Sequence, residues 1–194
     1  MDRAKLLELL LSLFPGEQPE TSHAYVTIRH SPEVAPRAYL HVIFDGLLAN
    51  EIASLESSLG ENIPTDFRAF LQHCNGAIFF LGALSLYGFR KNMSRDPGRR
   101  QPFDLVEMNT LERPSWLPIN GLIIGSYNFD GSYICASIAS AKIERRERGA
   151  GRILNIWPDL DSFLASEVAR LNALFSGLGI TEFDDAETTP AILM

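Results

Sequence analysis

Two short apolar runs, residues 122–127 and 133–138, flank a turn sequence that ends in Asp130-Gly131. Asp-Gly is a strong signal for a tight turn between antiparallel strands, because glycine adopts a positive φ without steric cost. The two runs therefore predict a β-hairpin. This feature commits the middle of the chain to an antiparallel sheet.

Three further pairs of segments have the composition of strands and are separated by turn-forming residues. One pair, residues 78–81 with 83–87, is interrupted by Gly82, so it fits either two strands or one bulged strand. Another segment, residues 142–148, is highly charged, so we expect it at an edge of the sheet. The pairs are residues 24–29 with 39–44, residues 78–81 with 83–87, and residues 142–148 with 152–157.

Other segments repeat their apolar residues at helical spacing. Pro15-Gly16, Gly60 and Asn75-Gly76 are expected to end the first three helices. The first helix either caps the core or binds a partner. A proline-rich stretch after the short fourth helix, residues 114–118, favours an extended connection. The predicted helices span residues 6–14, 48–59, 64–74, 104–113 and 158–175.

The net charge of the 194-residue chain is −7, from 24 acidic and 17 basic residues. This balance argues against nucleic-acid binding. It either keeps the protein soluble or eases the approach of a basic partner. Residues 90–100 are predicted to form a basic surface loop, and residues 181–189 carry acids without a base. We expect this acidic tail to be solvated and to contribute little to folding.

The sequence carries none of the usual motifs for phosphate, metal or nucleophile chemistry, so we expect no catalytic residues, cofactor or metal ion. Gly149 and Gly151 fit a hairpin turn better than a nucleotide-binding loop. Cys74 and Cys135 lie in apolar patterns typical of core residues rather than of a disulfide or a catalytic thiol. The scattered histidines favour ordinary structural roles, although three of them would meet if their strands pair: His23, His30 and His41.

The leucine-rich amino end does not have the features of a secretory signal, because Asp2 and Glu8 interrupt it and no cleavage site follows. No stretch approaches the roughly 20 apolar residues that cross a bilayer. We therefore expect a cytoplasmic protein without a membrane association.

A specific spacing pattern runs from the second predicted helix into the third: Ile52, Leu55, Glu56, Leu59, Gly60, Ile63, Pro64, Phe67, Arg68, Phe70, Leu71, Asn75 and Gly76. Further motifs follow in order: Leu84, Leu86, Tyr87 and Gly88, then Leu117-Pro118, Leu122, Ile124 and Gly125, Asp130-Gly131, and 157–164. Together they resemble the SUKH superfamily of Smi/Knr-like proteins over about residues 48–170.

The resemblance implies an α+β fold, with a twisted, mainly antiparallel sheet and helices packed mostly on one face. It places the core domain at residues 48–179. From the residue patterns we expect residues 1–47, a helix and strand pair, to belong to the same domain, and residues 180–194 to form an acidic flexible tail. Most of the motif residues can be explained by structure alone, because they start helices, end helices or turn hairpins.

The resemblance further implies a binding protein without catalysis. We expect an immunity protein that neutralises a basic bacterial toxin domain, encoded nearby, by stoichiometric complex formation. The alternatives are a regulatory scaffold in cell-envelope or signalling assembly and, less directly, an enzyme with a site built from scattered residues. Because loops often carry binding groups, the expected partner-binding residues lie in two connections: Glu107, Glu112, Trp116, Tyr127, Phe129 and Asp130.

Overall fold

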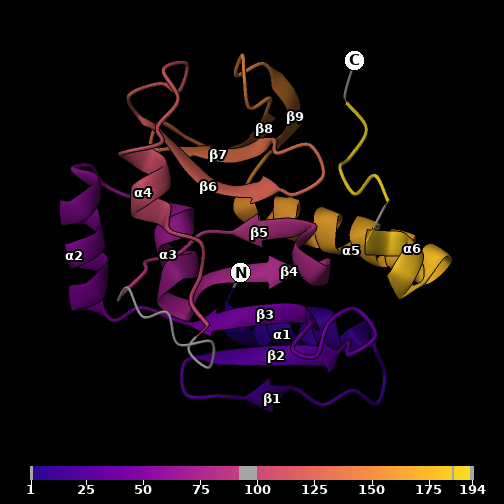
Figure 1. Cartoon of the computed structure of the whole chain (residues 1–194). Helices are drawn as coiled ribbons and strands as arrows, with labels where there is room; N and C mark the ends of the chain where they lie inside the picture. Colours follow the sequence, from indigo (N-terminus) through magenta and orange to yellow (C-terminus); the bar gives the residue numbers. More distant parts are fainter. Residues whose placement is uncertain (1, 92–99, 185, 193–194) are drawn as a thin grey trace.

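The structure is a computed structural model that describes residues 2–91, 100–184 and 186–192. These residues form one antiparallel sheet of nine strands, whose order in space follows their order in the sequence (Figure 1). Consecutive strands therefore build a continuous meander. The strands are β1 (Glu20–Thr21), β2 (Tyr25–His30), β3 (Tyr39–Asp45), β4 (Cys74–Phe79), β5 (Leu84–Leu86), β6 (Gly121–Tyr127), β7 (Tyr133–Ser137), β8 (Ser140–Arg146) and β9 (Ile153–Trp157).

Five of the six helices occupy two positions around the sheet, and α6 follows at the end of α5. In the view of Figure 1, α1 and α5 lie behind the strands, whereas α2, α3 and α4 lie near one end of them. A short 3-10 turn, Phe80–Gly82, joins β4 to β5. The helices are α1 (Arg3–Ser12), α2 (Ala49–Leu59), α3 (Thr65–His73), α4 (Leu105–Asn109), α5 (Leu160–Leu178) and α6 (Ile180–Asp184).

The predicted α+β class with an antiparallel sheet is confirmed, and so are the three predicted strand pairs and the hairpin that ends in Asp130-Gly131. The packing of most helices on one face stays a prediction, as do the boundaries of the three parts of the chain. The basic loop predicted for residues 90–100 falls mainly on residues 92–99, which lie outside the described residues.

The expected edge position of the charged strand is wrong. Strand β8 lies between β7 and β9, so β9 rather than β8 is the last strand of the sheet. The charge of Arg145 on β8 is tolerated there because its guanidinium is fully engaged by polar partners, although only 2% of the residue is exposed. The number of charged residues in a strand does not show whether a buried charge has polar partners inside the protein.

Two local predictions are also corrected. Asn75 and Gly76 do not follow the third helix as a cap, because α3 passes directly into β4, which contains both residues. Residues 114–118 are not an extended connection. Leu117 N–H donates to the Pro114 carbonyl at 3.1 Å, and Gly121 N–H donates to that of Pro118 at 2.9 Å, so this stretch forms successive turns.

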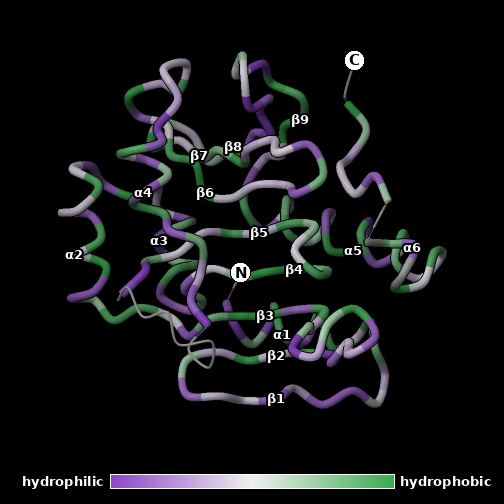
Figure 2. Tube along the Cα trace, in the orientation of Figure 1, coloured by the Kyte–Doolittle hydropathy of each residue, from purple (hydrophilic) through white to green (hydrophobic). Residues whose placement is uncertain are grey.

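The core lies between the strands and the helices, with buried residues from α1, α2, α3, α4 and α5 in one hydrophobic cluster. In Figure 2 hydrophobic residues follow the central strands β3 and β4, whereas β1 is hydrophilic. Aromatic rings from distant segments join there, with Phe14 of the segment after α1 near Phe175 of α5 at 6.1 Å between ring centroids. Cys74 and Cys135 are buried and free, and burial raises the pKa of each thiol to about 12. Both cysteines are core residues, as expected.

The carboxyl-terminal segment is not a solvated tail. Phe183 is 1% exposed and its ring lies 5.4 Å from that of Phe175. Thr188 and Thr189 are also buried, at 5% and 8% exposure. The prediction failed because acidic residues dominate the composition of this segment, while its contacts use one aromatic ring and main-chain carbonyl groups, which composition does not report.

We expect Phe67→Ala and Phe163→Ala each to lower the free energy of unfolding by about 3–5 kcal/mol, because each leaves a cavity in a packed core. Phe67 is 1% exposed and Phe163 is fully buried. Phe129→Ala is the control, since that ring is 51% exposed and its loss should change stability by less than about 0.5 kcal/mol. Denaturant unfolding measures all three, and a parent-like midpoint for either core variant would contradict the packing.

His41 is fully buried on β3 among aromatic rings, with that of Phe80 at 4.6 Å between centroids. Its Nδ1 accepts a hydrogen bond from the Phe80 N–H at 3.4 Å, and its Nε2 has no hydrogen-bond partner among the described residues. Burial, assisted by the charge of Arg29, lowers the pKa of His41 to about 3. The folded protein therefore requires the neutral ring.

This buried ring predicts a pH dependence of stability. The unfolded chain binds a proton at His41 below about pH 6.5 and the folded chain does not, so stability falls as the pH drops from 6.5 toward 3. The loss should be about 2 kcal/mol between pH 7.5 and pH 5. The variant His41→Asn should remove this slope, whereas His23→Asn, at an exposed position, should keep it. Unfolding curves across this pH range measure the difference, and an unchanged slope in His41→Asn contradicts it.

Candidate functional site

A groove lies on the sheet face opposite α5. Ser85, Ser126 and Tyr133 pair across β5, β6 and β7, so their side chains share one face. Tyr127 points to the opposite face, where its hydroxyl donates to Glu167 of α5 at 2.6 Å. We call the groove above Ser85 and Tyr133 the front groove.

The front groove consists of two adjoining hollows of about 380 and 420 Å³. Their shared floor and wall are apolar, consisting of Ile78, Tyr87, Phe103 and Met108. The first hollow extends along α4, and the second extends to the turn between β6 and β7 and to Arg148. Together they form a continuous surface rather than an enclosed cavity.

Two polar side chains fix the wall formed by α4, one within the helix and one between the helix and the sheet. Asp104 caps the helix, because its Oδ1 accepts from the N–H of Val106 at 2.9 Å and of Glu107 at 3.3 Å. The buried Asn109 accepts from the Ile123 N–H at 2.8 Å and donates to the Ile123 carbonyl at 2.8 Å. A register shift in β6 lies between residues 123 and 125, so this amide satisfies backbone groups at an irregularity in the ladder.

Tyr133 and Arg148 line the other side of the front groove, and Trp116 and Arg146 pack beside them. The Arg148 guanidinium lies over the Tyr133 ring at 5.8 Å, and the Arg146 guanidinium lies over the Trp116 ring at 6.0 Å. Trp116 Nε1 donates to the Arg148 carbonyl at 3.1 Å. Gly151, at φ 69°, packs against the same indole, and a Cβ there would lie 2.3 Å from it. This close approach requires glycine.

The predicted partner-binding residues lie on both sides of this groove. Exposed Glu107 and Glu112 line the first hollow, and half-buried Trp116 packs beside Tyr133 at 6.2 Å between ring centroids. Phe129 is 51% exposed in the turn that borders the second hollow. The structure therefore brings α4, with the connection that follows it, and the turn of residues 128–131 to one surface. Their contact with a partner stays a prediction.

The other two predicted residues have internal contacts. Tyr127 is 1% exposed, and burial first and the Glu167 carboxylate second raise its pKa well above the usual value. Asp130 receives hydrogen bonds from Ser132 and Arg145. Burial alone would raise the pKa of Asp130, but these bonds outweigh it and lower the pKa. Tyr127 thus supports the groove from behind, and Asp130 shapes the turn at its rim.

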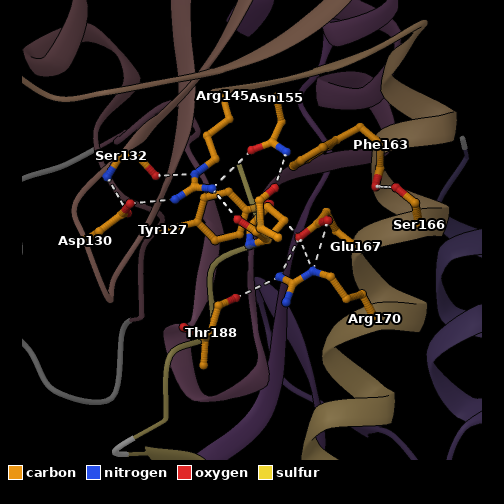
Figure 3. A network of polar contacts seen from close by, with 12 residues as sticks. Tyr127, Asp130, Ser132, Arg145, Asn155, Phe163, Ser166, Glu167, Arg170 and Thr188 are labelled. Atoms are coloured by element: carbon orange, nitrogen blue, oxygen red, sulfur yellow. Dashed lines mark hydrogen bonds and ion pairs between the residues drawn. The ribbon is translucent and has the colours of Figure 1, made fainter. Parts of the chain in front are cut away.

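Sequence reasoning missed the polar network behind the sheet, which Figure 3 shows. Glu167, at 2% exposure, accepts from Tyr127 and pairs with Arg170 at 2.7 Å. A signal for Glu167 was present, because it follows Phe163 and Leu164 at helical spacing and so falls on the apolar stripe of α5. Arg145 gave no such signal within its charged strand.

The described residues contain no group of three or more His, Cys, Asp or Glu side chains that could hold a metal ion. Among the helices in this part of the chain, none combines the length and apolar character required to span a bilayer.

A broad antiparallel sheet with an apolar groove on one face defines an α+β domain with a surface suited to binding. Residues 46–166, more than half of the chain, match the SMI1 / KNR4 family (SUKH-1), and the protein belongs to that family. The resemblance read from the sequence motifs is thereby confirmed. Domains of this family are generally non-catalytic, occur in immunity proteins and regulatory relatives, and bind protein partners such as toxins. Comparison with curated proteins found no match.

We expect Asn109→Ala to lower the free energy of unfolding by about 3 kcal/mol, because it leaves buried backbone groups of Ile123 without partners. Asn128→Ala, at an exposed position, should have an effect below about 0.5 kcal/mol. Thermal or denaturant unfolding of the two variants provides the comparison. Equal stabilities would show that Asn109 does not hold the α4 wall.

Proposed function

We propose that the protein is a cytoplasmic immunity protein that binds a basic toxin domain through the front groove and neutralises it as a stoichiometric complex. The observation that carries this proposal is the convergence of the two predicted binding loops on opposite sides of one groove. Membership of a family that includes immunity proteins supports it.

The composition of the front groove suits a protein partner. Aromatic, methionine and arginine side chains are enriched at the centres of protein interfaces, where they provide most of the binding energy. Phe103, Met108, Trp116, Tyr133 and Arg148 are such residues in or beside the groove, and Phe103 is 54% exposed.

The charges around the groove are asymmetric. Asp104, Glu107 and Glu112 line the first hollow together with one cation, Arg90, so acids are in excess there, whereas Arg148 is the charged residue of the second hollow. Acidic groups near a contact steer a positively charged partner and raise its association rate. The proposed toxin domain therefore presents its basic groups toward α4.

The regulatory alternative would use α1 or the basic loop as its docking element. Leu6 and Leu10 of α1 are fully buried, and Leu7, Leu9 and Leu11 are partly buried against the same core. This packing favours a structural role for α1. It therefore supports the immunity proposal over a scaffold that docks through this helix.

The proposal is tested by titrating the purified protein against the toxin domain encoded in the neighbouring reading frame. Inhibition should be stoichiometric, because the protein acts by occupying the toxin rather than by altering it. Inhibition at sub-stoichiometric amounts, or no binding at micromolar concentration, would reject the proposal.

We expect the double variant Glu107→Lys/Glu112→Lys to slow association with the toxin domain by about tenfold at low salt, because it reverses the charge on the α4 side. The control Glu8→Lys/Glu17→Lys changes the net charge equally at exposed positions of the amino-terminal region. Stopped-flow kinetics at two salt concentrations measure both. Equal rates for the two variants would show that only net charge matters.

A further inference from the structure

The carboxyl-terminal segment is held against the back of the sheet through its main chain. Three main-chain carbonyl groups accept hydrogen bonds from side chains of the domain (Figure 3). The Thr188 carbonyl accepts from Arg170 Nη2 at 2.7 Å, and the Pro190 carbonyl accepts from Arg145 Nη1 at 2.6 Å. The Ala191 carbonyl accepts from Asn155 Nδ2 at 2.8 Å. The three donors come from α5, β8 and β9. These bonds hold residues 188–191 through main-chain carbonyl groups and do not involve the side chains of those residues.

Arg145 also reaches the turn that borders the front groove. Its Nε donates to Ser132 Oγ at 2.8 Å, and its Nη2 donates to Asp130 Oδ2 at 2.6 Å. The other Asp130 oxygen accepts from the Ser132 N–H at 2.9 Å, which closes the turn. One guanidinium group therefore joins the carboxyl-terminal segment to the turn of residues 128–131.

This joint use of Arg145 makes the two contacts interdependent. A guanidinium group is planar, with its donors in a fixed fork, so one orientation must serve all its partners. Only 2% of Arg145 is exposed, and a buried charge is stable only when its donors are satisfied. If the segment detaches and the bond to the Pro190 carbonyl is lost, Asn155 Oδ1, at 3.1 Å, is the remaining acceptor for Arg145 Nη1. Water then gains access to the charge.

We propose that residues 186–192 act as an intramolecular clasp that fixes the rim of the front groove, with Arg145 as the positioning residue between them. Docking of the clasp holds the guanidinium in the orientation that Asp130 requires. Release of the clasp frees Arg145 to turn toward water and loosens the turn. The consequence for partner binding rests on the proposed function, whereas the coupling of clasp and turn does not.

Two variants remove the clasp in different ways. Deletion of residues 189–194 removes the Pro190 and Ala191 carbonyls, whereas deletion of residues 193–194 is the matched control that leaves all three carbonyls. Thr189→Glu keeps the chain at full length but places a charge at a position that is 8% exposed, which disfavours docking. The second variant keeps the test independent of any effect of truncation on folding.

Amide hydrogen exchange by NMR gives the readout. Ser132 N–H reports the turn directly. Ile123 N–H, which lies on β6 and donates to Asn109 of α4, reports general stability. We expect amide exchange at Ser132 to be about tenfold faster or more in both clasp variants, because this factor corresponds to the loss of one charge-assisted hydrogen bond. Exchange at Ile123 should change much less. The 193–194 deletion should match the parent.

Unchanged exchange at Ser132 in the clasp variants would overturn the proposal. Equal acceleration at Ser132 and Ile123 would also overturn it, because the clasp would then stabilise the whole domain without positioning the turn. No toxin is needed for this measurement, so its failure is distinct from a failure of the immunity proposal.

Discussion

Arg145 carries its charge inside the sheet, where an unpaired guanidinium group would be strongly destabilising. Its hydrogen bonds extend to Asp130 and Ser132 in a turn at the groove and to Pro190 in the carboxyl-terminal segment. The groove rim and the carboxyl-terminal segment therefore share one side chain as a hydrogen-bond donor. Tyr127 and Glu167 add a second polar link, between β6 and α5.

The architecture lets one sheet serve two purposes. The face toward α5 is packed and contains the buried polar network, so it fixes the strands. The opposite face carries the front groove, with α4 on one side and the turns of the β6–β7 and β8–β9 hairpins on the other. A rigid support of this kind positions loop residues for recognition with little loss of conformational entropy on binding.

Much of this fold could be predicted from local patterns, because hairpin turns and helical stripes are encoded in neighbouring residues. The Asp130-Gly131 turn and the stripe that contains Phe163 are examples. The interior position of β8 and the docking of residues 186–192 could not be predicted, because both depend on long-range partners of Arg145. The turn of residues 128–131 and the short helix that contains Glu107 were both predicted from local patterns. Their convergence, and the groove floor around Ile78, became visible only in three dimensions.

We propose that both sides of the front groove form one surface for a protein partner. Hydrogen exchange in the complex with the toxin domain shows which amide groups the partner protects. We expect protection in α4 and in the turn of residues 128–131 together, with no change in α1. Protection confined to α1 or to the β1 edge, with the groove residues unaffected, would contradict it.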